Sequence, residues 1–371
     1  MNIDVLFEIL LRLPVRSLLR FIGVHKSWYY IINSPGFRKL YNLRRNNNKD
    51  EEVYLCFFNY GRTLLSIDLL DNGKSLMWYN FQHNDQMKFK YASVSVSGEV
   101  KGLVCISSPC VLGLAICNPF LGQLKNLPLP LYASTHRQDL YAHHVGLGFD
   151  EDYKVVQLLL CSVHDCLHAN LYSARTNSWT ELDRHQDLII QKPIKSVCKN
   201  GSFAHWEGIT RKGSKKIILS FDMKNEVFRT IKISGTGDQE LDNYVRPFKD
   251  FMIFAKDECS FVILVMDEYK LKVYESNGEG SEVIWNNMNN VDLYYFWKDN
   301  FGWSTYDIPF WRNGNCVVLQ VRSSMVLKDR SSRELLLYDY HARKFIKHFE
   351  MSGISSSEYD IIEYEGSLIS P

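Results

Sequence analysis

A short unit that recurs about every 50 residues constrains the fold of this chain most strongly. Each copy is an apolar strand that ends at a polar anchor residue, then a tight turn and a second strand. The six copies read LLSIDLLDNGKSLMW, LAICNPFLGQL, ANLYSARTNSW, ILSFDMKNEVF, LKVYESNGEGSEVIW and LLLYDYHARKF. Their anchors are Asp68, Asn118, Ser173, Asp222, Glu275 and Asp339, at spacings of 50, 55, 49, 53 and 64 residues.

Four of the six copies place a large apolar residue six positions after the anchor, at Leu124, Trp179, Phe228 and Phe345. Other strand patterns lie between the copies: GLVCI, YKVVQLLL, NGSFAHW, FVILVM and NGNCVVL. Hairpins at a fixed period with strands between them are typical of a propeller of four-stranded blades, whereas a sandwich needs no repeat. We therefore expect a mainly β chain whose residues 53–371 form one closed propeller of about six divergent blades, with YDIIEYEGSLIS giving a strand to the first blade.

The start of the chain has the periodicity of three short helices instead. The first predicted helix, between Asp4 and Pro14, has apolar residues at Val5, Leu6, Ile9, Leu10 and Leu13. The second has Val15, Leu18, Leu19 and Ile22, and the third has Val24, Trp28, Ile31 and Ile32 and ends before Pro35. A unit of about 40 residues without disulfides or metal rarely folds alone, so we expect it to pack on the rest of the chain or on another protein.

Composition and charge exclude several classes of protein. The chain is 46% hydrophobic, and its net charge of 43 − 42 = +1 gives no field that favours nucleic acid or a membrane surface. Residues 1–49 carry nine basic and two acidic residues, net +7, which leaves 34 − 40 = −6 for the rest, and a polar run at 46–52 predicts a linker. Nine cysteines, with Cys105, Cys117 and Cys316 inside strand patterns, and no apolar run long enough for a membrane span favour the cytoplasm or the nucleus.

The sequence shows no pattern of an enzyme. Gly73-Lys74-Ser75 imitates the end of a phosphate-binding loop, but Asp68 stands where the first glycine of that loop is needed. In CSVHDCLHA, His164, Cys166 and His168 alternate along one strand face, but without a second pair of ligands a loop or strand edge is favoured over a metal site. We expect no catalytic residues, no metal and no cofactor.

The N-terminal stretch DVLFEILLRLPVRSLLRFIGVHKSWYYIINSPGF resembles the F-box, the helical module that docks onto the Skp-type adaptor of a cullin ubiquitin ligase. The likeness covers roughly residues 1–44 and rests on LP after the first helix, S-L-L-R-F, V-x-K-x-W and the closing S-P-x-F. It implies positions that face the adaptor or brace the helices at Leu10, Leu13, Pro14, Leu18, Leu19, Val24 and Trp28. F-boxes usually carry a Leu-Pro just before the first helix, where this chain reads Met1-Asn2-Ile3.

The body resembles the F-box-associated, kelch-like domain of plant F-box proteins. Six stretches carry this resemblance and follow one another in the same order as in that family: GLVCISSPCVLGLAICNPFLGQLKNLPLP, GFDEDYKVVQL, LYSARTNSWTEL, ILSFDMKNEVFRTIKI, LVMDEYKLKVYE and IPFWRNGNCVVLQV. Within that group it looks most like the S-locus F-box and S-locus F-box-like proteins. The resemblance implies an F-box over 1–45, a linker over 46–52 and a propeller over 53–371, in a receptor that directs a target to ubiquitination. The S-locus resemblance implies that this target is a basic ribonuclease of the style, which takes part in self-incompatibility. A kelch-like scaffold with weak or no ligase coupling is the alternative.

An aromatic segment at 294–311 is the candidate target-binding site. It holds nine aromatic residues in eighteen positions, and four of them are our candidate contacts: Trp297, Phe301, Trp303 and Tyr306. Aromatic side chains on loops of a rigid scaffold often supply most of the binding energy of an interface. The alternative is that most of these rings fill the core of a blade. A polar loop at 131–144 is long enough to reach a ligand as well.

Overall fold

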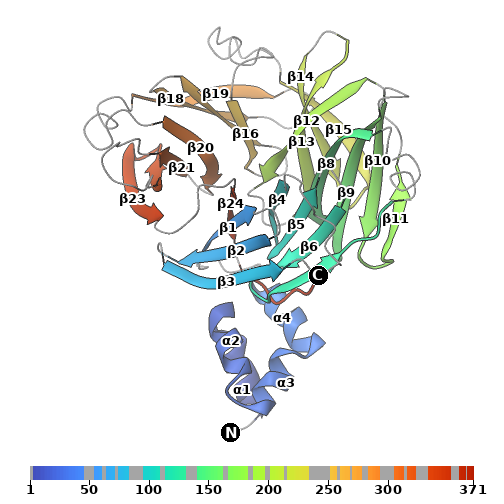
Figure 1. Cartoon of the computed structure of the whole chain (residues 1–371), viewed down its shortest axis with the longest axis vertical. Helices are drawn as coiled ribbons and strands as arrows, with labels where there is room; N and C mark the ends of the chain where they lie inside the picture. Colours follow the sequence, from blue (N-terminus) through green and yellow to red (C-terminus); the bar gives the residue numbers. More distant parts are fainter. Residues whose placement is uncertain are drawn as a thin grey trace.

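The computed structural model describes residues 3–45, 54–60, 64–71, 74–82, 95–108, 113–130, 140–161, 166–182, 187–196, 201–212, 215–233, 251–256, 260–267, 270–277, 283–292, 305–312, 316–322, 333–351, 359–364 and 366–371. Figure 1 shows the helices below a body of strands, with the sheets following one another around that body. We call residues 3–45 the helical module and residues 54–371 the β-body.

The helical module contains α1 (Ile3–Leu10), α2 (Val15–Ile22), α3 (Lys26–Ile32) and α4 (Pro35–Arg45). The sequence predicts three helices, so α4 is a correction. The sequence predicts that the third helix ends before Pro35 and that no helix follows. The first position of a helix needs no backbone donor, so Pro35 begins α4. The hydroxyl oxygen of Ser34 caps this helix by accepting a hydrogen bond from the N–H of Phe37 at 3.3 Å.

The first three sheets each have four strands. One has the order β24-β1-β2-β3, with β24 (Tyr359–Tyr364), β1 (Tyr54–Tyr60), β2 (Leu64–Asp71) and β3 (Lys74–Gln82). The next has the order β4-β5-β6-β7, with β4 (Ser95–Val100), β5 (Leu103–Ser108), β6 (Gly113–Asn118) and β7 (Gln123–Asn126). The third has the order β11-β10-β9-β8, with β8 (Leu140–Phe149), β9 (Tyr153–Cys161), β10 (Cys166–Ser173) and β11 (Ser178–Glu181).

The remaining strands form an eight-stranded and a four-stranded sheet. The larger sheet joins two four-stranded halves, β12 (Leu188–Ser196), β13 (Phe203–Thr210), β14 (Lys216–Asp222) and β15 (Val227–Lys232) with β16 (Phe251–Ala255), β17 (Phe261–Asp267), β18 (Lys270–Asn277) and β19 (Ile284–Asp292). The halves meet where β12 and β16 run parallel for two residue pairs. The last sheet contains β20 (Thr305–Arg312), β21 (Cys316–Arg322), β22 (Arg333–Asp339) and β23 (Lys344–Met351).

The fold is mainly β and propeller-like, with one difference from expectation. The predicted C-terminal strand is confirmed, because β24 pairs antiparallel with β1, with Tyr54 opposite Tyr364. The sequence predicts a closed propeller, but no sheet among the described strands closes on itself. The two ends of the β-body are instead held together by the β24–β1 pairing.

The recurring sequence unit is confirmed as a hairpin in all six copies: β2–β3, β6–β7, β10–β11, β14–β15, β18–β19 and β22–β23. In four copies the large apolar residue lies opposite the residue that precedes the anchor: Cys117 with Leu124, Tyr172 with Trp179, Phe221 with Phe228 and Tyr338 with Phe345. Asp68 and Glu275 differ, because they lie within longer strands opposite Trp78 and Asn286. These two anchors therefore do not mark the start of a turn.

The other four anchors share one turn geometry. The fourth residue after the anchor has a left-handed backbone: Gly122 (φ 60°), Asn177 (φ 51°), Glu226 (φ 57°) and Arg343 (φ 54°). At three of these anchors, Asn118, Asp222 and Asp339, the side-chain Oδ1 accepts hydrogen bonds from the N–H groups two and three residues later. Such a side chain satisfies the backbone donors of the turn, which explains why the anchor is polar.

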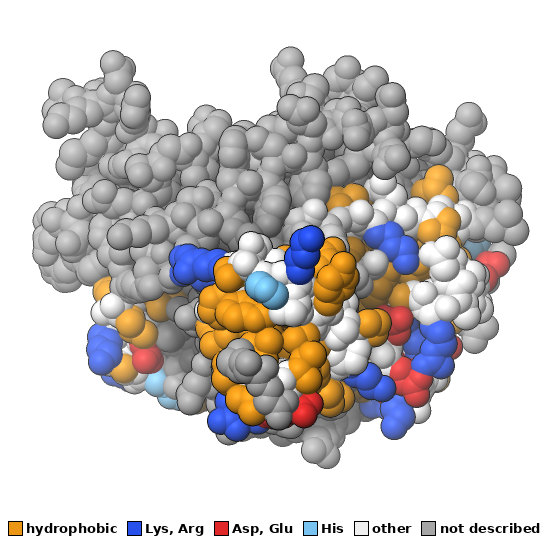
Figure 2. Space-filling model, turned by 90° about the horizontal axis from the view of Figure 1, so that it is seen from below, with side chains coloured by type: hydrophobic (Ala, Val, Ile, Leu, Met, Phe, Trp, Pro, Cys, Tyr) orange, Lys and Arg blue, Asp and Glu red, His pale blue; other side chains and the backbone are white. Residues whose placement is uncertain are grey.

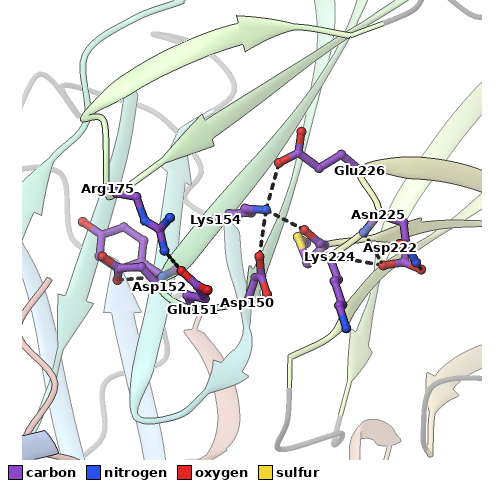
Figure 3. Close-up of polar contacts among 11 residues, drawn as sticks. Asp150, Glu151, Asp152, Lys154, Arg175, Asp222, Lys224, Asn225 and Glu226 are labelled. Carbon is purple, nitrogen blue, oxygen red and sulfur yellow. Dashed lines mark hydrogen bonds and ion pairs between the residues drawn. The ribbon is translucent and has the colours of Figure 1, made fainter.

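Neighbouring sheets are joined by apolar clusters and by polar contacts at the turns. Figure 3 shows one such contact, in which Lys154 of β9 reaches the turn between β14 and β15. Its Nζ donates to the carbonyl oxygen of Met223 at 2.7 Å, to Glu226 at 2.8 Å and to Asp150 at 3.3 Å. Burial alone would lower the pKa of Lys154, but the hydrogen bonds to Glu226 and Asp150 raise it above its ordinary value.

Candidate functional site

A group of exposed apolar side chains on the helices is the most unusual surface among the described residues. Eight of the twelve exposed large hydrophobic side chains in that part of the chain lie in the helical module, and we call these eight the docking face. Its members are Ile3, Val5, Ile9, Val24, Tyr29, Tyr30, Leu40 and Leu43, each 46–70% exposed. Figure 2 shows hydrophobic side chains gathered over this part of the molecule, seen from below. Large apolar side chains gathered on an exposed surface are typical of an interaction site.

The arrangement follows from helices that are apolar on more than one side. In α1, Leu6 and Leu10 are buried at 7% and 1% exposure, while Val5 and Ile9 on the neighbouring face remain 52% and 46% exposed. A surface helix of a globular protein usually has one apolar stripe, so a second stripe needs another partner. The β-body does not cover this second stripe in the structure.

The helical module that carries the docking face also carries exposed basic residues. Arg12, Arg20, Lys26 and Lys39 have exposed side chains, and Arg44 pairs with Glu8 at 3.2 Å. Charges at the rim of an interface mainly guide the approach of the partner and select among partners. The rim therefore favours a partner with an acidic surface.

The seven residues that resemblance assigns to the adaptor occupy different environments. Leu10 and Leu18 are buried at 1% and 0% exposure, Leu13, Leu19 and Trp28 are partly buried against the same apolar cluster, and Pro14 and Val24 are exposed. Trp28 packs edge-on against Phe21, with ring centroids 5.0 Å apart. Leu10 and Leu18 are thus placed to brace the helices and Val24 to meet a partner. Their roles in binding stay predictions.

Sequence reasoning missed the part of the module that α4 supplies. Phe37 is fully buried, packs edge-on against Phe7 with centroids 5.2 Å apart and stacks on Tyr41 at 6.0 Å. The hydroxyl of Tyr41 donates a hydrogen bond to the carbonyl oxygen of Leu13 at 2.9 Å, next to the Pro14 corner. The serine followed by proline, with apolar residues at Phe37, Leu40 and Tyr41, is the signal that predicts this helix.

The candidate target-binding residues of the β-body lie mostly outside the described residues. This holds for Trp297, Phe301 and Trp303 and for residues 131–139 of the predicted polar loop. The last five residues of that predicted loop, 140–144, lie in β8 and are not a loop. Tyr306 lies on β20, opposite Val321 of β21. These assignments stay predictions.

The cysteine and histidine cluster lies inside a sheet. Cys166 and His168 are buried at the start of β10, which lies between β9 and β11 and so is neither a loop nor an edge strand. The Sγ of Cys166 is 3.3 Å from Nε2 of His168, whose Nδ1 is 3.8 Å from Oε1 of Glu181. His164 lies outside the described residues, and within the described ranges no three metal-ligating side chains are placed to hold an ion.

Two further features of the described residues are a small cavity and a set of buried cysteines. A cavity of about 30 Å³ lies between β4, β8, β12 and β13 and is lined by Val96, Val145, Ile194, Ala204 and His205. It has room only for water. Burial raises the pKa of the Cys105 and Cys117 thiols, which makes them poor nucleophiles. Of the helices that the structure describes, none has the length and apolar character to cross a membrane.

The fold and the docking face define a class of protein: a propeller-like β-body that carries a helical interaction module. The F-box domain family matches residues 1–40, and the F-box associated beta propeller domain family matches residues 49–371. The chain belongs to the F-box proteins with an F-box-associated β-propeller domain.

Its relatives include plant F-box proteins. F-box protein At2g43440 of Arabidopsis thaliana is 26% identical over 234 residues, covering 62% of this chain and 52% of that protein. F-box/kelch-repeat protein At2g43445 of the same plant is 28% identical over 233 residues, covering 62% and 51%. F-box protein CPR1, also from Arabidopsis thaliana, is 24% identical over 303 residues, covering 72% and 70%. The chain spans about half the length of the first two relatives.

Likeness to solved structures is weak. TolB from Acinetobacter baumannii has a TM-score of 0.44 at 10% identity, over 88% of this chain and 70% of that one. The β-propeller domain of the trilobed protease from Pyrococcus furiosus has a TM-score of 0.38 at 11% identity, over 69% and 70%. Likeness at this level says nothing about function.

Proposed function

We propose that this chain is the substrate-recognition subunit of a Skp-cullin-F-box ubiquitin ligase. The helical module docks onto a Skp-type adaptor, the β-body binds a target protein, and the target is directed to ubiquitination and degradation. The chain itself performs no catalysis. The observation that carries the proposal is the docking face, eight exposed apolar side chains on a module that the F-box family matches.

The physical reason is that exposed apolar area is costly in water and is stabilised when a partner covers it. Val24, at the turn between α2 and α3, is 62% exposed and is also one of the residues that the F-box resemblance assigns to the adaptor. The basic rim, with Arg12, Arg20 and Lys26, suits an acidic adaptor surface. Two features of the module, its exposed apolar area and its basic charge, therefore favour the same partner.

The test is binding of a recombinant plant Skp-type adaptor, measured by calorimetry with purified full-length protein. Val24→Asp places a charge in the docking face and should weaken binding by about 2 kcal/mol or more, roughly 30-fold, with no change in melting temperature. Leu129→Asp is the matched control, because Leu129 is an exposed apolar residue of the β-body, 41% accessible. Wild-type protein that binds no adaptor overturns the receptor role and favours the kelch-like scaffold, and Val24→Asp that binds like wild type overturns the docking face.

We also propose a target with a basic surface, in the cytoplasm or the nucleus. The support is the net charge of −6 outside residues 1–49 and the resemblance to S-locus F-box proteins, which implies a style ribonuclease of self-incompatibility. A purified basic style ribonuclease should bind the full-length chain, and binding should weaken with salt because opposite charges are screened. Absence of binding at low salt removes the ribonuclease and leaves the adaptor proposal intact.

A further inference from the structure

The last six described residues, 366–371, lie between the β-body and the helices. Figure 1 places the C-terminus at the base of the β-body, close to α4. These residues follow directly after β24, the strand that pairs with β1 and joins the two ends of the β-body. We call residues 366–371 the C-terminal brace.

The brace is fixed to the β-body by side chains of the second sheet. The side-chain amide of Asn118 donates hydrogen bonds to the carbonyl oxygens of Ser367 at 3.0 Å and Ile369 at 2.8 Å. Gly102, with φ of 77°, leaves no room for a Cβ because the Ser367 side chain occupies that space. Asn118 and Ser367 are both buried, at 0% and 4% exposure, so this end of the brace is held firmly.

The other end of the brace contacts the helices through one arginine. Arg38 of α4 donates from Nη1 to the hydroxyl of Ser370 at 2.7 Å and from Nη2 to Oδ1 of Asn33 at 2.6 Å. The amide of Asn33 in turn donates to the carbonyl oxygen of Tyr29 in α3 at 2.9 Å. The two prongs of one planar guanidinium thus link α3 to the end of the chain, and a planar fork of this kind fixes direction as well as distance.

Buried apolar side chains also connect the brace to the helices and to the β-body. Leu368 of the brace is 1% exposed and belongs to one continuous buried cluster with Phe37 and Tyr41 of α4 and with Leu10 of α1. The same cluster contains Phe120 and Tyr364 of the β-body, whose rings stack with centroids 5.8 Å apart. The helical module and the β-body therefore share a core at the brace.

From these contacts we propose that the C-terminal brace, through Arg38, sets the angle between the docking face and the β-body. Arg38 and Ser370 are positioning residues: they hold the target-binding body in one orientation relative to the adaptor. The functional consequence rests on the proposed receptor role, because the transfer of ubiquitin to a bound target depends on how the target is oriented.

The test detects a change of this angle as a change in the distance between two labels, and it needs neither adaptor nor target. Spin labels are attached through a genetically encoded keto amino acid at Tyr30, 70% exposed on α3, and at Val227, 46% exposed on β15, because the chain's nine cysteines exclude thiol labelling. Pulsed electron paramagnetic resonance on the full-length protein then gives the distribution of distances between the labels. We expect one narrow peak in the wild type.

Two variants should lose that single peak. Arg38→Lys keeps the charge but not the fork, and Ser370→Ala removes the acceptor at an exposed residue where little else changes. Lys39→Met, which alters the neighbouring exposed charge on α4, is the matched control and should keep the wild-type distribution. Both brace variants giving the wild-type peak overturns the proposal.

Failure of the brace proposal can be told apart from failure of the proposed receptor role. If an Arg38 variant fails to fold, as judged by circular dichroism, Ser370→Ala decides. The brace variants should bind the Skp-type adaptor as tightly as wild type, since Ser370 and Arg38 lie outside the docking face. Val24→Asp should lose adaptor binding and keep the wild-type distance between the labels. Ser370→Ala should broaden the distribution of label distances and keep adaptor binding. The two results together assign the two roles to different residues.

Discussion

The helical module and the β-body use apolar side chains in opposite ways. The module exposes eight large hydrophobic side chains over some forty residues, whereas the described part of the far longer β-body exposes four. The body buries its strands in clusters between neighbouring sheets, such as the one around Trp206, Leu219 and Phe221. The module instead shares its core with the base of the β-body and leaves a second apolar surface open. A short unit that cannot build a full core alone is suited to be completed by partners.

The largest effect is expected when one aromatic ring is removed, either from the core that the helices share with the β-body or from a core within the β-body. Phe37→Ala, in the core that the helices share with the β-body, should cost about 3–5 kcal/mol and melt the helical module before the strands. Phe221→Ala, equally buried within the β-body, should cost a similar amount but destabilise the strands themselves. Thermal unfolding followed by circular dichroism, with proteolysis to locate the unfolded part, measures both. A single cooperative transition that shifts equally in both variants would contradict separate behaviour.

A smaller effect tests the turns, which belong to the β-body alone. Asp222→Ala should cost about 1–2 kcal/mol, because the N–H groups of Lys224 and Asn225 lose their acceptor. Lys224→Ala is the control and should stay within about 0.5 kcal/mol, since Lys224 takes part through its backbone. Urea unfolding at neutral pH measures the difference, and equal costs for the two variants would show that the anchor side chain is dispensable.

The same carboxylate makes the stability of the turn depend on acid. Burial alone would raise the pKa of Asp222, but hydrogen bonds from Asn225 and Lys224 and the charge of Arg229 hold it below its ordinary value. Its contribution is therefore complete above the unfolded pKa of about 3.9 and is lost as the pH falls through the lower folded value. In urea unfolding, the difference in free energy of unfolding between wild type and Asp222→Ala should become smaller in acid. A difference that becomes larger in acid would refute this.

The smallest effect is expected at the link between the third sheet and the following one. Lys154→Met should cost about 1 kcal/mol, because the side chain is mostly buried while its partner Glu226 is about half exposed. The folded pKa of Lys154 is raised, so the contribution is complete below the unfolded pKa of about 10.4 and is lost as the pH rises through the folded value. Unfolding of wild type and variant from about pH 8 to about pH 11 should show the difference in their free energies of unfolding shrink toward the alkaline end. A constant difference would mean that packing, not charge, accounts for the cost.

Much of the β-body could be predicted because its signals are local. A polar anchor, a left-handed residue four positions later and a large apolar residue six positions later fix a hairpin within seven residues, as at Asp222, Glu226 and Phe228. At Asp68 and Glu275 the hairpin is confirmed, but longer strands place the turn further along the chain than the anchor. The sequence prediction missed α4 because a proline after a helix also fits the first position of the next one.

The candidate site was less predictable. Periodicity identifies the apolar residues of α1 but cannot tell Leu10, which is buried, from Ile9, which is exposed, because the helix has apolar residues on both sides. Arg38 carries no local signal at all. Its role arises from Ser370, which lies 332 residues further along the chain.

By itself the sequence determined the hairpins, the helices before Pro35 and the division into a helical and a β part, since each depends on side chains a few residues apart. Tertiary structure alone decided the register of β24 on β1, the joining of β12 to β16, and the seating of the brace on Asn118, 249 residues away from Ser367. The physical reason is that turns and helices are stabilised by contacts within the segment, whereas these features depend on which distant backbone groups and side chains meet after the β-body has assembled.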